Sequence, residues 1–211
     1  MKEFNSKYKK QIMFLENEYQ ARWGNKSIPI NLLKNIYDFT NKESRILEIG
    51  CNQGYNLQFL KKIGYENLYG LDSSKHDVSQ GKSKFPNINI FNVDITSELI
   101  NTQEKFDVIF SKSTLQHIEF SKIDRLFDRV FNNLNKQGMF IFQETVFMDP
   151  ANQTMYEKIL RQDATNKNGT TIGSRIFCHN YFKLVDTWEN KSCTILDKNN
   201  RLTSVIFYIK T

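Results

Sequence analysis

A glycine-rich turn that begins with an acidic residue is the part of the sequence best suited to chemistry. It spans residues 48–54 (EIGCNQG), after an apolar run at residues 45–49 and before a segment with helical spacing at residues 54–63. A turn of this kind aims the N–H groups of a helix start at a ligand, and glycine lets the backbone approach that ligand closely. The pattern therefore predicts a cradle for a nucleotide.

Two further acidic residues follow the next two apolar runs of the chain. Asp72 comes after residues 67–71 and Asp94 after residues 88–93. An acidic side chain in the position of Asp72 can accept hydrogen bonds from both hydroxyls of a ribose, and Asp94 can meet the edge of an adenine. Structural roles stay open, namely strand–helix packing for the glycines, a helix cap for Asp72 and a loop acid for Asp94.

Strand and helix signals alternate through the middle of the chain. Alternation of this kind predicts a parallel sheet that is covered by helices on both faces. Two late apolar runs predict a final antiparallel hairpin, and helices are expected before the first strand. The expected strands are residues 45–49, 67–71, 88–93, 106–111, 139–144, 181–188 and 203–209, and the expected helices are residues 8–19, 29–39, 54–63, 74–84 and 123–134.

This order of strand, ExGxxxG turn and two acidic residues resembles the class I S-adenosylmethionine-dependent methyltransferases, over about residues 45–145. The resemblance implies an α/β, Rossmann-like fold with a seven-stranded, mostly parallel sheet, an antiparallel last strand and helices on both faces. It also implies S-adenosyl-L-methionine as cofactor and S-adenosyl-L-homocysteine as product. A nicotinamide dehydrogenase is the alternative, but its usual GxGxxG differs from the Gly50-x-x-x-Gly54 found here.

The resemblance also implies cofactor-binding roles for individual residues. Glu48 would face the amino end of the methionine, and Asp72 would hold the ribose hydroxyls. The implied set is Glu48, Gly50, Cys51, Gly54, Asp72, Ser73, Asp94, Ile95, Ser111 and Arg22. Asn52 stands where the family often has glycine, and asparagine tolerates left-handed backbone better than most residues. Cys51 is also interpreted as a small buried filler.

Arg22 lies in the stretch YQARW at residues 19–23, after an expected amphipathic helix. This stretch faintly resembles the opening of methylases associated with bacterial surface-glycan pathways. The resemblance implies that Arg22 pairs with the cofactor carboxylate or with an acidic substrate. An exposed arginine beside a core Trp23 is the structural alternative.

His117 and Glu144 are the candidate catalytic residues. His117 lies just beyond the fourth expected strand, and a histidine titrates near neutral pH, which suits a general base. Its alternative role is a packed histidine at a helix start. Glu144 and Asp149, at the end of the fifth expected strand, are candidates to orient an acceptor, whereas Glu144 could also cap backbone amides; His179 is a weaker candidate. No metal is expected, because the spacing of these residues matches no metal-binding pattern.

Charge and cysteine content restrict the class of protein. The net charge is +6, and the excess lies at the two ends, with +4 in residues 1–45, −2 in residues 46–150 and +4 in residues 151–211. Three cysteines without a CxxC pair argue against a disulfide scaffold or a zinc ribbon. No apolar run is long enough to span a bilayer, and no secretory signal is recognised. We therefore expect a cytoplasmic protein.

A single domain is expected for the 211 residues. Residues 1–42 would form a helical lid, residues 43–150 the cofactor-binding core, and residues 151–211 a helix and a strand hairpin.

The sequence thus predicts a methyltransferase for a small, anionic acceptor. An O-methylation of a nucleotide-linked or phosphorylated capsule-polysaccharide precursor, such as a sugar or phosphoramidate, would fit the basic ends. An RNA or DNA methyltransferase is an alternative, although residues 111–114 (SKST) lack the Asn/Asp-Pro-Pro-Tyr/Phe element used on exocyclic base amines. The other alternative is a non-catalytic S-adenosylmethionine-binding protein.

Overall fold

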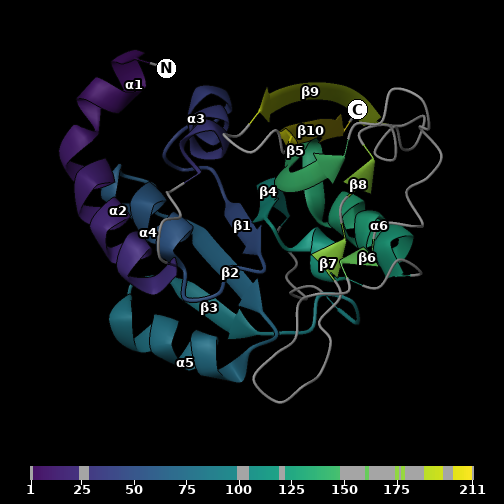
Figure 1. Ribbon diagram of the computed structural model, residues 1–211, viewed down its shortest axis with the longest axis horizontal. Coiled ribbons are helices and arrows are strands. Elements are labelled where there is room, and N and C mark those ends of the chain that lie inside the picture. Colours follow the sequence, from purple (N-terminus) through teal and green to yellow (C-terminus); the bar gives the residue numbers. More distant parts are fainter. Residues whose placement is uncertain are drawn as a thin grey trace.

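A sheet with seven strands along its main path forms the centre of the computed structural model, in the order β3-β2-β1-β4-β5-β10-β9 (Figure 1). The structure describes residues 2–23, 29–98, 105–118, 122–147, 160–161, 174–175, 177–178, 188–196 and 202–210. The strands of the path are β1 (Ile46–Ile49), β2 (Leu68–Asp72), β3 (Asn89–Asn92), β4 (Phe106–Lys112), β5 (Leu134–Phe147), β9 (Trp188–Leu196) and β10 (Leu202–Lys210).

Strand direction confirms the expected fold class. Strands β1 to β5 run parallel to one another, whereas β10 is antiparallel to both β5 and β9. A short strand β8 (Phe177–Cys178) adds to β5, and β6 (Leu160–Arg161) pairs with β7 (Ser174–Arg175) apart from the main sheet. Where the strand order turns back, between β1 and β4, an open α/β sheet normally binds its ligand at the carboxyl ends.

Helices cover both faces of the sheet. They are α1 (Lys2–Lys7), α2 (Lys9–Trp23), α3 (Ile30–Phe39), α4 (Tyr55–Lys62), α5 (Lys75–Lys84) and α6 (Ile123–Asn133). Buried side chains of α1 to α5 share one hydrophobic cluster with the sheet, and α6 packs into a second cluster on the opposite face. Helices α1 and α2 run along the outer side of α4 (Figure 1).

Burial on both faces explains why β1 is a continuous apolar run interrupted by one charge. All four residues of β1 are buried, including Glu48. Paired residues of parallel strands point to the same face, and successive residues alternate. Glu48 pairs with Phe110 and therefore faces α4, whereas Ile49 pairs with Ser111 on the face of α6.

Two strands differ from their expected bounds. Strand β5 begins at Leu134, five residues earlier than expected, because Leu134 pairs with Phe106 before a bulge restores regular pairing at Met139. The residues of that bulge are polar and do not alternate between polar and apolar, so the sequence there contains no strand signal. The expected strand at residues 181–188 meets β9 only at Trp188, and residues 181–187 lie outside the described part of the chain. β9 is an edge strand with polar residues, so its sequence lacks an apolar run.

Candidate functional site

Left-handed backbone shapes the turn that follows β1. Gly50, Asn52 and Gly54 have φ angles of 70°, 51° and 82°. The N–H groups of Gly50 and Cys51 both donate to the carbonyl of Leu71, at 2.8 and 2.9 Å. The turn is thereby tied to the end of β2, and α4 starts directly after Gly54. Asn52 adopts a left-handed conformation, which asparagine was expected to tolerate.

The two glycines leave no room for a side chain. A Cβ atom on Gly50 would collide with the side chain of Thr114, and a Cβ atom on Gly54 would lie 2.7 Å from Cδ1 of Ile90. Close packing of the chain on itself, together with the positive φ angles, therefore requires glycine at both positions. Contact of these glycines with a cofactor stays a prediction.

Asp72 connects the turn with the start of α5. One carboxylate oxygen accepts a hydrogen bond from the N–H of Asn52 at 2.7 Å, and the other accepts from the N–H of Ser74 at 2.8 Å. The N-cap of α5 is Ser74, whose hydroxyl accepts from the N–H of Asp77. Each carboxylate oxygen can accept a second hydrogen bond, so Asp72 keeps capacity for two ribose hydroxyls. Ser73, between Asp72 and the cap, is exposed.

Glu48 is a carboxyl group inside the protein. It is 1% exposed, and its Oε1 atom accepts a hydrogen bond from Asn56 Nδ2 at 2.6 Å. Burial raises the pKa of Glu48 from 4.5 to about 8; the Asn56 hydrogen bond and the Lys112 charge act against this, and the Asp72 charge adds to it. A cation placed beside Glu48 would stabilise its ionised form.

Buried polar atoms without a hydrogen-bond partner gather around the turn and the adjacent strand ends. Six such side-chain atoms occur among the described residues. One of them, Lys42 Nζ, lies apart, near the start of β1 and over the Tyr37 and Tyr65 rings. The five others are Glu48 Oε2, Asn52 Oδ1, Asn56 Oδ1, Ser111 Oγ and Gln143 Oε1. Buried polar groups are normally satisfied by protein, water or a ligand. The five atoms therefore fit a polar ligand at the carboxyl edge, such as the aminoacyl and ribose parts of S-adenosylmethionine.

Cys51 packs into the sheet. Its side chain is 4% exposed, and a Cβ atom on Gly70 would lie 2.6 Å from its sulfur. Burial, followed by the charges of Glu48 and Asp72, raises the pKa of the Cys51 thiol well above its ordinary value. A thiol of this kind is a poor nucleophile, which agrees with its interpretation as a buried filler.

Asp94 and Ile95 lie after β3. Asp94 is exposed, and its carboxylate accepts a hydrogen bond from the N–H of Thr96 at 2.9 Å, which lowers the pKa of that carboxyl. Ile95 is buried in the second hydrophobic cluster. Asp94 thus stabilises its own loop in this structure, and contact with an adenine stays a prediction.

Of the two candidate catalytic residues, only His117 has a described side chain. His117 is exposed and lies in the 3₁₀ turn Leu115–His117, at the same edge of the sheet as the glycine turn. The backbone of Glu144 lies in β5, and Arg22 lies in the last turn of α2; their side chains are outside the described part of the structure. Asp149 and His179 are outside it entirely.

Three residues at this edge were not expected from the sequence, namely Asn56, Lys112 and Gln143. Each interrupts an apolar pattern, since Asn56 is a buried polar residue of α4 and the other two lie within apolar strands. A polar residue beside apolar neighbours is the only trace of these residues in the sequence, and it does not show which face they occupy. Lys112 and Gln143 are register partners in β4 and β5.

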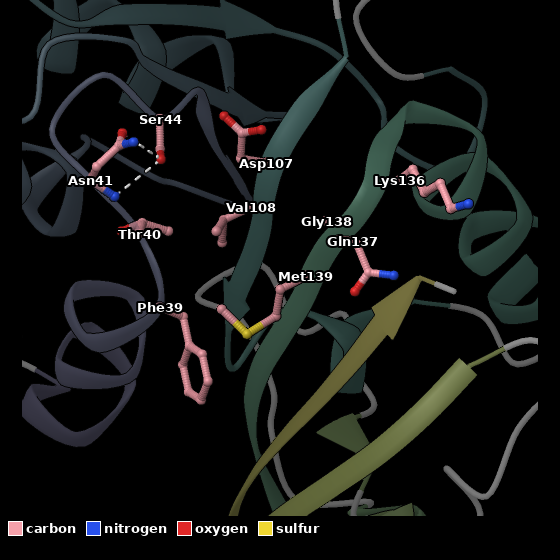
Figure 2. A pocket seen from close by; sticks show the side chains of 10 residues that line it. All are labelled: Phe39, Thr40, Asn41, Ser44, Asp107, Val108, Lys136, Gln137, Gly138 and Met139. Atoms are coloured by element: carbon pink, nitrogen blue, oxygen red, sulfur yellow. Dashed lines mark hydrogen bonds between the residues drawn. The ribbon is translucent and has the colours of Figure 1, made fainter.

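A cavity of about 290 Å³ lies at the opposite, amino-terminal edge of the sheet (Figure 2). Asp107 in its wall already accepts hydrogen bonds from the N–H of Arg45 at 2.9 Å and from Asn135 Nδ2 at 2.7 Å. Asn41 and Ser44 bond to each other across its rim (Figure 2). Because these polar groups are satisfied within the chain, the cavity is a poorer cofactor site than the carboxyl edge.

The described residues contain neither a metal-binding cluster nor a membrane-spanning helix. No group of three or more His, Cys, Asp or Glu side chains there is arranged to hold a metal ion. Within the same residues, no helix combines the length and hydrophobicity needed to cross a membrane.

Comparison with known proteins agrees with this geometry. The family described as "Methyltransferase domain" matches residues 19–172. A malonyl-(acyl-carrier protein) O-methyltransferase of Calditerrivibrio nitroreducens is 29% identical over 150 residues, 70% of this chain and 55% of that protein. A carboxy-S-adenosyl-L-methionine synthase of Campylobacter concisus is 29% identical over 114 residues, 51% of this chain and 47% of that protein. The chain spans about half the length of such curated relatives.

A solved structure shows the same fold. An S-adenosylmethionine-dependent methyltransferase from Clostridium acetobutylicum superposes with a TM-score of 0.66 at 12% identity, covering 92% of this chain and 97% of that one. The family match, the strand order with its antiparallel β10 and the turn joined to Asp72 lead to one conclusion. The chain belongs to the class I S-adenosylmethionine-dependent methyltransferases.

Proposed function

We propose that the protein transfers the methyl group of S-adenosylmethionine to an oxygen atom of a small, anionic acceptor. The observation that carries this proposal is the group of five unpartnered polar atoms beside the glycine turn and Asp72. S-adenosylmethionine supplies an electrophilic methyl group, so the protein's own task is to bind, orient and exclude water.

Different residues of the carboxyl edge would bind different parts of the cofactor. Asp72 would accept from the ribose hydroxyls, and Glu48 with Asn56 would face the amino end of the methionine. The turn backbone would lie along the ligand. We also keep the predicted cofactor contacts of Ser73, Asp94, Ile95, Ser111 and Arg22.

The acceptor is proposed to be anionic because of two observations. The basic excess lies in the chain ends, which flank the cofactor-binding core in the sequence. One relative is, by its name, an O-methyltransferase of a malonyl group, which ends in a carboxylate. A carboxylate is therefore favoured over the phosphorylated capsule precursor expected from the sequence, for which the relatives reported above give no support.

For the wider organisation we propose what the sequence led us to expect. We propose one domain and a cytoplasmic location. Of the lid expected from residues 1–42, residues 39–41 line the cavity at the opposite edge, so the proposal keeps only the end of α2 near the acceptor site. His117 and Glu144 would lie on the acceptor side, where His117 would act as base for a hydroxyl acceptor.

Calorimetry with S-adenosylhomocysteine, followed by transfer of labelled methyl groups to a panel of acceptors, tests the proposal. We expect cofactor binding and faster methylation of anionic acceptors than of their neutral analogues. Faster methylation of neutral or cationic acceptors would refute the anionic class. Retention on RNA or DNA that falls steeply with salt, together with methylation of that nucleic acid, would favour the alternative function.

A further inference from the structure

The methyl end of the donor and the acceptor must meet over β4 and β5. With Asp72 of β2 on the ribose, a ligand that crosses the switch point between β1 and β4 directs its other end toward β4. Lys112, at the carboxyl end of β4, is half-buried there. Its register partner in β5 is Gln143.

Strand alternation places these two side chains on one face. Glu48 pairs with Phe110, and Phe110 is two residues before Lys112, so all three lie on the face that α4 covers. Gln143 points to this face as well because it pairs with Lys112. The Lys112 ammonium lies near enough to Glu48 to lower the pKa of that carboxyl.

The backbone fixes the pair side by side. Ser113, with a φ of 52°, ends the regular part of β4, and its N–H donates to the carbonyl of Gln143 at 2.8 Å. Oε1 of Gln143 is buried and has no hydrogen-bond partner. An amide oxygen and nitrogen can exchange places by rotation, so Gln143 offers either a donor or an acceptor to a ligand.

We propose that Lys112 and Gln143 hold a carboxylate as the methyl acceptor and so determine the specificity of the enzyme. This inference rests on the proposed function, because it presupposes a methyl donor bound over the glycine turn. One ammonium group and one amide suit a planar monoanion, whose non-reacting oxygen they would hold. A phosphate dianion would call for more positive charge than a single lysine beside the carboxyl group of Glu48 provides.

The reaction balances without a general base. The carboxylate oxygen forms a bond to the methyl carbon while the carbon–sulfur bond breaks, and the electron pair of that bond stays on sulfur. The products are a methyl ester and a neutral thioether. No proton moves, because a carboxylate is already ionised at neutral pH.

The test uses the malonyl thioester of N-acetylcysteamine as the carboxylate probe and the matching malonamoyl thioester as its neutral twin. The variants are Lys112→Met, Lys112→Arg and Gln143→Leu. The control is Lys136→Met, which removes an exposed lysine at the opposite edge of the sheet. Probe binding to the S-adenosylhomocysteine complex is measured by calorimetry, and methyl transfer is measured with labelled donor.

Loss of the charge should affect the carboxylate probe specifically. Lys112→Met should weaken its binding and raise its KM by about 10- to 100-fold, and Gln143→Leu should do so by a smaller factor. Lys112→Arg should restore most of the binding, and Lys136→Met should change nothing. The affinity of Lys112→Met for S-adenosylhomocysteine should stay within about 5-fold, because a partly exposed lysine that does not contact the cofactor acts on it only through a screened charge.

The outcomes separate the two proposals. A wild-type protein that does not bind S-adenosylhomocysteine would refute the proposed function. A wild-type protein that binds it but binds neither thioester would overturn the present inference alone. Preference for the neutral twin would overturn the present inference together with the anionic class of acceptor, and would leave the binding of the methyl donor untouched. An unchanged KM and affinity for the carboxylate probe in Lys112→Met would also overturn it.

Discussion

The carboxylate of Asp72 accepts a hydrogen bond from the backbone N–H of Asn52 at 2.7 Å. This contact joins the end of β2 to the glycine turn after β1. Asp72 therefore has a structural role before any ligand binds, and each of its carboxylate oxygens keeps the capacity for one more hydrogen bond. If Asp72 also binds the ribose, as we predict, structure and binding are coupled at this residue.

Replacement of Asp72 tests that coupling. Asp72→Ala should weaken binding of S-adenosylhomocysteine by about 1–3 kcal/mol, through the loss of charged hydrogen bonds. It should also lower the free energy of unfolding, because the N–H groups of Asn52 and Ser74 lose their acceptor. Asp38→Ala, which removes an exposed aspartate of α3 and only its i,i+4 ion pair with Lys34, is the control. Unchanged affinity in calorimetry would refute the placement of the ribose.

The buried carboxyl of Glu48 predicts a pH dependence of stability. Its folded-state pKa of about 8 lies above the ordinary value of 4.5, so the folded protein retains the proton longer than the unfolded chain. The stabilisation is complete below about pH 4.5 and is lost as pH rises through about 8. Relative to Glu48→Gln, the wild type should lose at most about 1.4 kcal/mol of unfolding free energy per pH unit in this window.

Denaturant titrations of both proteins between pH 5 and pH 9 measure this difference, and the exposed Glu66→Gln serves as control. Parallel stability profiles for wild type and Glu48→Gln would contradict the raised pKa.

The left-handed turn predicts different effects on stability for two substitutions two residues apart. Gly50→Ala should destabilise the protein by more than the roughly 1–2 kcal/mol that left-handed backbone costs an ordinary residue, since the new Cβ also meets Thr114. Asn52→Gly should be nearly neutral, because glycine adopts the same φ freely. Thermal unfolding of both variants distinguishes them, and equal losses would contradict the geometry of the turn.

The expected effect of replacing His117 depends on whether the acceptor is a carboxylate or a hydroxyl group. If the acceptor is a carboxylate, His117→Ala should lower turnover by less than about 10-fold, because general-base catalysis is not required. The pH–rate profile should then stay flat around the histidine pKa. A loss of about 100-fold or more would assign His117 as the base and would favour a hydroxyl acceptor.

Much of the fold could be predicted because buried parallel strands are apolar along their whole length. Strands β1, β2 and β4 lie within a residue of the expected bounds, as does α4 between its flanking glycines. β9 begins where the expected strand at residues 181–188 ends, and it was not recognised because an edge strand needs no apolar run. The bulge before Met139 depends on pairing between distant segments, which the local pattern does not contain.

The candidate site was predictable where chemistry follows from a residue's place after a strand. Asp72 and the glycine turn lie together as expected. Lys112 and Gln143 were missed because their face depends on strand register, which one sequence does not specify. Asn56 was missed because a buried partner for Glu48 becomes visible only when α4 packs on β1.

A crystal structure of the complex with S-adenosylhomocysteine tests the central claim most directly. We predict that the ribose hydroxyls lie on Asp72 and that the aminoacyl end lies against Glu48, Asn56 and Ser111, which would satisfy their unpartnered atoms. Electron density for the ligand at any other place, such as the amino-edge cavity beside Asp107, would contradict the account.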